Sequence, residues 1–304
     1  MKNAMLILPV LSGILWGSSG IFVRNLSAFG MDGATVLASR ALGAVIVMGL
    51  FLLVTDREKL RCKPKDLWVL IGGGLLGMLG LNLCYNAAIN QLTLSLAAVL
   101  LSTSPVFVMF LAAIIFREKI TARKIVCMLM AIVGCMFASG VLELSSGATF
   151  SAGGIAIGVL AAAFYALYSI FSRLAMDRGY HTFTIIFYNL LAVTIVLIPF
   201  AKWNILGAYM TEVPAGNSLF LLLHSVCTSV LPYVLYTVAL NYVETGKASI
   251  LAAGGEPIAA VVFGLLFYHE MPTVLTLLGL VITIVALALL VTPAKKERVL
   301  TDSP

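Results

Sequence analysis

The sequence predicts an all-α integral membrane protein with ten transmembrane helices, arranged as two inverted five-helix repeats. Of its 304 residues, 61% are hydrophobic and 11% are charged, against about 45–50% and about 25% in an ordinary soluble domain. The charged residues gather in short clusters between long apolar segments. A set of residues also recurs at an offset of 152 positions. Together these observations predict a duplicated membrane domain.

The apolar segments justify the helices one by one. A hydrocarbon core about 30 Å thick requires about 20 apolar residues per helix, and cutting the chain at its charged and turn-rich breaks yields ten such segments. The first segment lacks a convincing signal-peptide cleavage site, so we expect it to be a span. The predicted spans are 4–23, 33–54, 67–89, 94–116, 123–140, 152–174, 183–202, 217–241, 247–268 and 273–291.

The distribution of Lys and Arg predicts the orientation of these spans. If the N-terminus is cytoplasmic, 16 of the 19 basic residues fall in inner segments. Only Arg24 and Lys202 fall in outer segments, and Arg40 lies within the second span. Cytoplasmic loops carry an excess of Lys and Arg, so this split predicts a multi-pass protein of the cell (inner or plasma) membrane. An even number of spans then places the C-terminus in the cytoplasm as well.

The internal repeat aligns residues that chance does not easily pair. At the offset of 152, Pro105 aligns with Pro257 and Glu118 aligns with Glu270. Because each unit has an odd number of spans, the second copy is expected to be inverted relative to the first, as in many secondary transporters. The predicted divisions are a first repeat at 1–145, a second repeat at 146–294 and a cytoplasmic tail at 295–304.

Several short motifs occur in a specific order along this pattern. Leu-Trp-Gly-Ser-Ser-Gly at 15–20 is followed by Arg40, by Ser-Pro-Val-Phe at 104–107 and by Arg-Glu-Lys at 117–119. The second half repeats the last pair as Glu-Pro at 256–257 and His-Glu at 269–270. With these motifs, the chain resembles the EamA branch of the drug/metabolite transporter superfamily over residues 4–291. The resemblance implies a ten-helix fold, cytoplasmic termini, and export or exchange of amino acids or related metabolites.

Two charged residues inside predicted spans are candidates for substrate binding. Glu256 lies near the middle of the ninth span, where a charge costs about 2.5–3.5 kcal/mol. It either faces an aqueous cavity, where it binds a cationic group or exchanges protons, or locks its helix to a neighbour. Arg40 either binds a substrate carboxylate, or extends to the outer headgroups or forms a structural pair.

Polar and aromatic side chains recur at helical spacing on several spans, so each set shares one face of its helix. These faces are expected to line a cavity or to make helix contacts, because polar groups facing lipid are costly. Pro105 and Pro257 are candidate hinges, or else static kinks. The remaining candidate binding residues are Trp16, Asn82, Tyr85, Asn86, Tyr165, Tyr168, Tyr233 and Tyr236.

Glycine pairs four residues apart, including Gly13 with Gly17, predict close helix packing. Bulky residues should be tolerated less well there than at Gly30, which we place in an outer loop. Glu118 is expected to be either a solvated charge at a helix end or part of a gate with basic residues. The sequence predicts no metal site, no cofactor and no nucleic-acid partner. The expected partners are a small-molecule substrate, the bilayer and in one version a proton, with the chain a monomer or homodimer.

The predicted function is that of a secondary transporter, an exporter or exchanger of small metabolites such as amino acids, working by alternating access. A multidrug or organic-cation exporter is the alternative within the same class. A membrane-embedded enzyme or a receptor is the alternative from another class. We expect no enzyme, because converging His, Asp or Cys groups cannot be assembled from the sequence.

Overall fold

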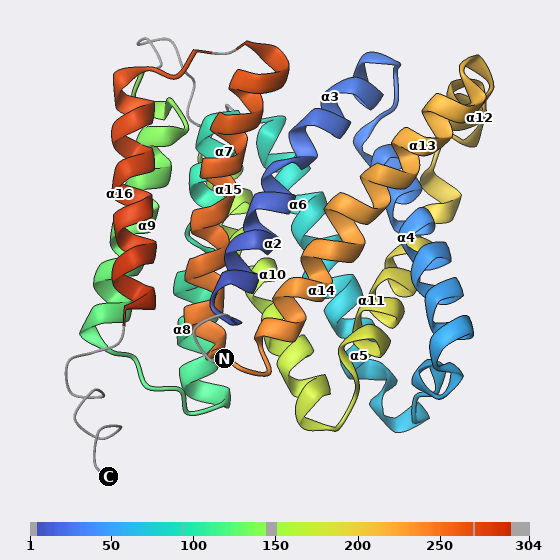
Figure 1. Cartoon of the computed structure of the whole chain (residues 1–304), viewed down its shortest axis with the longest axis horizontal. Coiled ribbons are helices and arrows are strands. Elements are labelled where there is room, and N and C mark those ends of the chain that lie inside the picture. Colours follow the sequence, from blue (N-terminus) through green and yellow to red (C-terminus); the bar gives the residue numbers. More distant parts are fainter. Residues whose placement is uncertain (1–4, 93, 144–150, 270, 293–304) are drawn as a thin grey trace.

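The computed structural model describes residues 5–92, 94–143, 151–269 and 271–292, and in these ranges the chain is helical without strands. The helices stand side by side as a bundle (Figure 1). The longer helices are α2 (Ile7–Gly17), α3 (Ser19–Ala28), α4 (Gly33–Thr55), α5 (Leu67–Gly72), α6 (Gly80–Ile89), α7 (Leu94–Leu101), α8 (Ser104–Ile115), α9 (Ala122–Ala138), α10 (Ala152–Asp177), α11 (Thr182–Leu197), α12 (Trp203–Glu212), α13 (Pro214–Ser225), α14 (Leu231–Ala239), α15 (Thr245–Tyr268) and α16 (Val274–Val291). Short helical turns are η1 (Arg57–Leu60), η2 (Pro64–Asp66), η3 (Gly73–Leu79), η4 (Val141–Glu143), η5 (Ile198–Phe200) and η6 (Val226–Val230).

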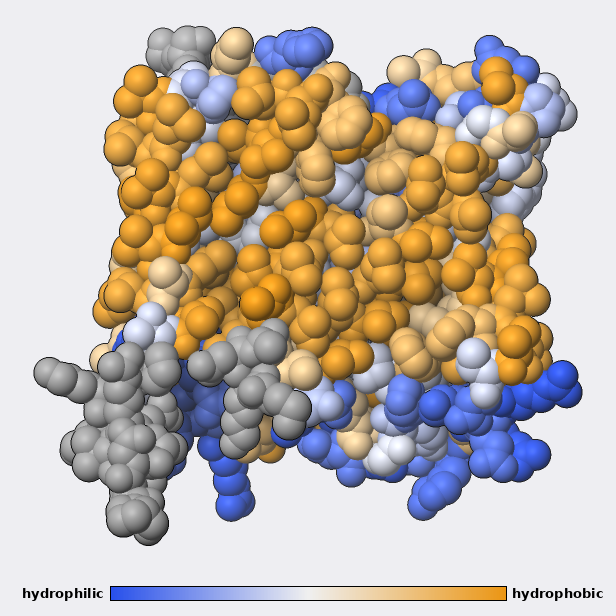
Figure 2. Space-filling view, in the orientation of Figure 1, coloured by the Kyte–Doolittle hydropathy of each residue, from blue (hydrophilic) through white to orange (hydrophobic). Residues whose placement is uncertain are grey.

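Within the described ranges, nine helical segments are long and apolar enough to cross a membrane. The all-helical, multi-pass membrane protein is therefore confirmed at that level. The predicted span at 123–140 corresponds to α9, which has 17 residues and packs along α16. Figure 2 shows apolar side chains covering the middle of the molecule and hydrophilic ones gathered along the lower edge.

The lower edge of Figures 1 and 2, here called the lower face, holds the loops at 56–66, 116–121 and 240–244. The upper face holds the turn at 29–32 and the segment at 198–213. The described chain begins and α16 ends at the lower face (Figure 1). Most of the basic residues in the described loops therefore lie on one side of the apolar belt.

Several predicted spans are interrupted in ways that hydropathy does not reveal. The first span is broken at Ser18 into α2 and α3, and the fourth at residues 102–103 into α7 and α8. The third and eighth spans contain π-helical turns, Gly73–Leu79 and Val226–Val230. Such turns insert an extra residue into a helix and often occur at functional sites. The two π-helical turns lie at nearly the same offset as the sequence repeat.

One helix, α12, was not predicted from the sequence, because ten residues are too few for a span. It lies at the upper face, where Leu206 and Tyr209 are buried against Leu26, Met31 and Val36. These contacts, more than the intrinsic preference of its residues, hold α12 in place.

The predicted close packing of Gly13 and Gly17 is confirmed. A Cβ atom at Gly13 would overlap the carbonyl oxygen of Ala252 on α15. A Cβ at Gly17 would lie 2.6 Å from the carbonyl oxygen of Glu256 and 2.7 Å from the Cβ of Ala259. The α2–α15 seam formed by these residues brings two backbones together and fixes the position of Glu256.

Candidate functional site

Arg40 and Glu256 are charged side chains in the membrane-spanning part of the molecule, and both are partly buried. Arg40 projects from α4, and its Nη2 donates a hydrogen bond to Asn82 Oδ1 at 3.3 Å. Asn82 in turn donates from Nδ2 to the carbonyl oxygen of Met78 at 2.7 Å. Arg40 forms no ion pair with any described residue. The partner of Arg40 among the described residues is therefore a neutral amide, and no carboxylate neutralises its charge there.

Glu256 lies on α15 where that helix contacts α2 across the seam. Its carboxylate makes no ion pair or hydrogen bond within the described ranges. It lies within electrostatic range of Tyr85, Tyr165 and Tyr233. A carboxylate without a partner in a membrane interior is expensive, and such groups usually serve transport of ions or substrates.

Aromatic rings from α2, α10 and α14 form an aromatic cluster, and its member Tyr233 lies within electrostatic range of both charges. Trp16 lies 5.1 Å from Tyr233, 5.7 Å from Tyr236 and 5.9 Å from Tyr165, measured between ring centroids. Tyr168 and Tyr233 pack edge to face at 4.9 Å. Trp16 also packs edge to face against Tyr165 and against Tyr233. Aromatic quadrupoles favour this arrangement.

The hydroxyl groups of the cluster differ in their partners. Tyr168 OH is 2.8 Å from Thr237 Oγ1, and Tyr236 OH is 2.8 Å from Ser169 Oγ, so both tie α10 to α14. Tyr165 OH is buried and has no hydrogen-bond partner within the described ranges. In this conformation the Tyr165 hydroxyl is therefore a buried polar group of the cluster that is available to a ligand.

Two further predicted binding residues, Tyr85 and Asn86, lie outside the aromatic cluster, and within the described ranges neither forms a hydrogen bond with Arg40 or Glu256. Tyr85 packs with Ala88 and Leu92, although it stays within electrostatic range of Glu256. Asn86 is exposed, and its Nδ2 lies 3.0 Å from where a Cβ at Gly33 would be. Helical spacing placed both residues near Asn82 in the sequence, but neighbouring helices decide which of them face the aromatic rings.

The two candidate hinge prolines occupy different local structures. Pro105 is in the first turn of α8, directly after the break at residues 102–103. Pro257 lies inside α15, which continues through it from Thr245 to Tyr268. Proline is well tolerated in a first helical turn but removes a backbone hydrogen bond from a helix interior. A hinge role stays a prediction for both.

His224 was not among the candidates, although it is also an ionisable residue inside a span. Its side chain is fully buried, and neither ring nitrogen has a hydrogen-bond partner among the described residues. The ring stacks on Phe22 at 5.1 Å between centroids. The same reasoning that selected Glu256 and Arg40 could have selected His224. Among the described residues, no group of three His, Cys, Asp or Glu side chains is placed to hold a metal ion, so His224 is not part of a metal site there.

At the lower face, Glu118 holds the start of α15. Its Oε1 accepts a hydrogen bond from the backbone N–H of Thr245 at 2.7 Å, and Oε2 accepts one from Gly246 at 3.2 Å. The expectation of a solvated charge, or of pairing with basic residues, is wrong in this conformation, since Glu118 binds backbone amides. A carboxylate is favoured there because the N-terminus of a helix carries partial positive charge.

A second contact reinforces this junction. Lys124 Nζ lies 2.5 Å from a carboxylate oxygen of Glu244 and also donates to the carbonyl oxygen of Lys119 at 2.9 Å. Glu118, Lys124 and Glu244, with the first amides of α15, are called the lower latch below. They connect the loop between α8 and α9 to the loop between α14 and α15.

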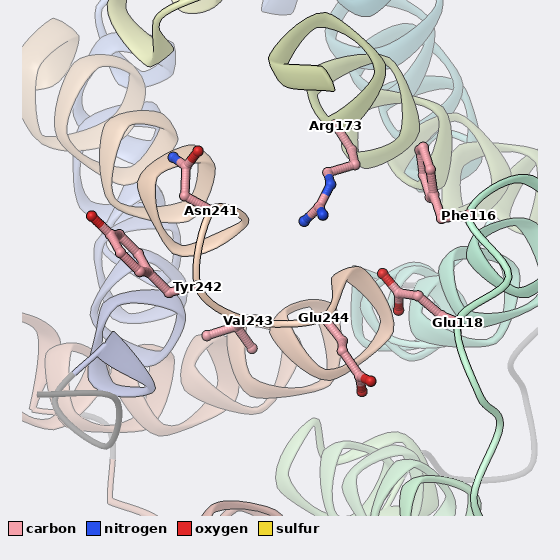
Figure 3. Close-up of a pocket in the computed structure, with 7 residues that line it drawn as sticks. All are labelled: Phe116, Glu118, Arg173, Asn241, Tyr242, Val243 and Glu244. Atoms are coloured by element: carbon pink, nitrogen blue, oxygen red, sulfur yellow. The ribbon is translucent and has the colours of Figure 1, made fainter. Parts of the chain in front are cut away.

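A cavity of about 240 Å³ opens at the lower face beside this latch. Figure 3 shows Arg173, from α10, and Glu118, from the loop before α9, pointing toward the same space. Arg173 lines the cavity and donates a hydrogen bond to the carbonyl oxygen of Leu240 at 2.5 Å, and Leu240 itself is fully buried. The lining residues are Phe116, Glu118, Arg173, Asn241, Tyr242, Val243 and Glu244.

A multi-pass helical bundle with unpaired charges beside an aromatic cluster is typical of membrane transporters. The EamA-like transporter family matches residues 3–140 of this chain and again residues 152–292. The chain belongs to the EamA-like transporter family.

Individual relatives agree with this assignment. An uncharacterized transporter of Archaeoglobus fulgidus is 26% identical over 89% of this chain and 90% of its own length. The pseudopaline exporter of Pseudomonas aeruginosa is 28% identical over 94% of this chain and 95% of its own length. A solved crystal structure covers 100% of both chains with a TM-score of 0.73 at 15% sequence identity, which shows a shared fold.

Proposed function

We propose that this protein is a secondary transporter that exports or exchanges small zwitterionic metabolites such as amino acids. The observation that carries the proposal is the pair Arg40 and Glu256, which have opposite charges and no ion-pair partner among the described residues. Arg40 would bind the carboxylate of the substrate and Glu256 its amine. The aromatic cluster between them suits an apolar side chain.

Alternating access between two inverted repeats is the mechanism we propose. It is supported by the two successive matches to one family and by the π-helical turns at equivalent places in both halves. The lower latch and the Arg173–Leu240 hydrogen bond fit a conformation closed at the lower face. The upper edge has a notch in Figure 2, and helices of both halves of the sequence stand on each side of it in Figure 1. The opposite conformation would release the latch.

We further infer ten spans, with α9 as the fifth, and a cytoplasmic lower face that carries both termini. The basic loop at 56–66 is the basis, because positively charged loops stay inside. A cysteine introduced at the exposed Lys65 in a cysteine-free background should react with an impermeant maleimide only in inside-out vesicles. Labelling in intact cells would refute this topology.

Flux measurements in proteoliposomes test the substrate. Wild type, Glu256→Gln and Arg40→Ala are compared for counterflow of amino acids, pseudopaline and organic cations across a pH series. Both variants should lose amino-acid exchange by at least about tenfold, the effect of losing one charged contact. Glu212→Gln, at an exposed position of α12, is the matched control.

The same experiment decides between the alternatives. If Glu256→Gln keeps full transport with unchanged pH dependence, Glu256 is structural and the proposed binding mode is wrong. If Arg40→Ala is silent while Glu256→Gln stops cation flux, the protein is an organic-cation exporter, which the aromatic cluster also suits. Absence of counterflow with every solute would favour an enzyme or a receptor.

A further inference from the structure

His224 is a buried polar residue whose hydrogen bonds are missing from the described structure. Its side chain is fully buried, and both Nδ1 and Nε2 are without partners. A neutral imidazole has one donor and one acceptor, and an imidazolium has two donors. Leaving such groups unpaired in an interior costs free energy, so each case requires an explanation. Binding of a ligand supplies one.

The surroundings of His224 restrict what that ligand is. Its helix, α13, packs against α4 so closely that a Cβ at Gly43 would overlap the hydroxyl oxygen of Ser225. Arg40 is one helical turn before Gly43, and His224 directly precedes Ser225. The two side chains accordingly lie within electrostatic range of each other. This part of the bundle therefore holds a cation and an unpaired imidazole together.

No carboxylate of the described protein neutralises this pair. Arg40 donates only to the Asn82 amide, and His224 contacts the ring of Phe22, which stacks on it at an angle of 18°. The other titratable group in range of Arg40 is Tyr233. A guanidinium and an imidazole N–H form a donor set for a carboxylate, which accepts several hydrogen bonds.

We propose that His224 is a specificity-determining residue, whose imidazole donates to the same substrate carboxylate that Arg40 binds. The stack on Phe22 fixes the plane of the ring, so that the donor is held ready for the ligand. His224 thereby favours zwitterions over amines that lack a carboxylate. This inference rests on the proposed function and adds a second carboxylate donor to that site.

A competition assay compares phenylalanine with phenethylamine, which differ only by the carboxylate, as inhibitors of counterflow. In His224→Phe the inhibition constant for phenylalanine should rise about tenfold, the factor for one hydrogen bond to a charged group. The constant for phenethylamine should stay within about twofold of wild type. His224→Gln keeps a donor and should restore part of the preference.

Stability separates this role from a structural one. His224→Phe removes unpaired buried polar atoms and should keep or raise the melting temperature while selectivity falls. Ser172→Ala, which removes another buried hydroxyl without a partner, is the matched control and should keep wild-type selectivity. A lower melting temperature with unchanged selectivity in His224→Phe would show that the residue is structural.

A measurement that keeps His224 in place does not depend on the folding of a His224 variant. The chain has three histidines, so ¹⁵N-histidine labelling gives few imidazole signals. His181→Gln and His269→Gln assign the remaining signal to His224. Phenylalanine should shift the His224 ring signal and phenethylamine should not; equal shifts with both compounds, or none with either, would overturn the inference.

The two proposals fail in different ways. If Arg40→Ala weakens phenylalanine binding and His224→Phe does not, the role of His224 is wrong and the proposed transport of zwitterions survives. If neither variant changes the ratio of the two constants in a protein that exchanges both compounds, the zwitterion site itself is wrong.

Discussion

The charged side chains of the lower latch have bonding partners, whereas those of the membrane interior have no ion-pair partner among the described residues. At the latch, Glu118 is bound by two backbone amides and Lys124 is paired with Glu244. In the interior, Arg40 and Glu256 are left without ion-pair partners among the described residues. The cost of an unpaired charge is larger in the interior than at the aqueous surface. On the function proposed above, the charges at the latch hold a conformation, while the charges in the interior bind a ligand.

The largest effect, a loss of folded protein, is expected from a bulky substitution in the α2–α15 seam, which disrupts the interior without changing a charge. Gly17→Leu should displace α15 at Glu256, because even a Cβ would lie 2.6 Å from the carbonyl oxygen of Glu256. Overpacking of this kind costs about 3 kcal/mol or more, so most of the folded protein should be lost. Size-exclusion profiles of the detergent-solubilised protein measure the outcome.

Gly20→Leu is the matched control for that substitution, since a Cβ at Gly20 meets nothing within 4 Å. Gly30, although it lies outside the spans, is a poorer control because its φ of 99° already disfavours any side chain. Equal profiles for Gly17→Leu and Gly20→Leu would mean that the α2–α15 seam yields easily and does not fix Glu256.

Breaking the latch should increase how often the lower face opens, with a smaller effect on the stability of the protein. Glu118→Ala removes the acceptor of the first two amides of α15, so the closed lower face is expected to open more often. A cysteine at the fully buried Ser172, in a cysteine-free background, reports this opening. Its reaction rate with a maleimide added from the lower side should rise about tenfold or more, as a shift of about 1.4 kcal/mol implies.

Glu58→Ala, which removes an exposed carboxylate from another loop of the lower face, serves as the control for Glu118→Ala. If labelling at position 172 stays at the wild-type rate in both variants while melting temperature falls only in Glu118→Ala, the carboxylate merely caps a helix. That result would show that Glu118 does not control the opening of the lower face, and the contrast with the interior charges would be wrong.

The ion pair of the latch should contribute less than its short distance suggests. The Lys124 side chain is 7% exposed, but that of Glu244 is 53% exposed, so water screens the pair. A double-mutant cycle with Lys124→Met and Glu244→Gln should give a coupling energy of about 0.5–1 kcal/mol. A coupling well above that range, or one insensitive to salt, would show that the pair is more buried than the geometry indicates.

A similarly small effect is expected at the upper face, where Asp32 caps α4. Its Oδ1 accepts from the backbone N–H of Thr35 at 2.9 Å, and Lys202 lies 3.0 Å away. Hydrogen bonding to Thr35, followed by the interaction with Lys202, lowers the pKa of Asp32 to about 2. Asp32→Ala should destabilise the protein by about 1 kcal/mol, as for a lost helix cap.

The sign of the pH dependence follows from this lowered pKa. Because the folded state holds the ionised form, the contribution of Asp32 is complete above the usual carboxyl range and is lost as the pH falls through about 2. Melting curves of wild type and Asp32→Asn should therefore differ at pH 7 and converge as the solution is acidified. A difference that persists unchanged into strong acid would assign the effect to packing.

The sequence by itself determined the membrane class, most of the span positions and the residues worth suspecting. Length and hydropathy predict spans because a bilayer imposes one requirement on every helix, and isolated charges such as Glu256 stand out against that apolar background. The break at Ser18 and the π-helical turns were not predictable, because they change local geometry without changing hydropathy. The ten-residue helix α12 was missed because it is too short for the same requirement.

Only the tertiary structure decided which of the candidate site residues contact one another. Trp16 and Tyr233 are more than 200 residues apart in the sequence, yet their rings pack together. Asn86 shares a helix with Asn82 but is exposed and lies outside the aromatic cluster. It likewise decided that Glu118 binds the amides of α15 and that His224 has no partner among the described residues. Such pairings depend on helix rotation and on neighbours distant in sequence, and periodicity along a single helix carries no information about either.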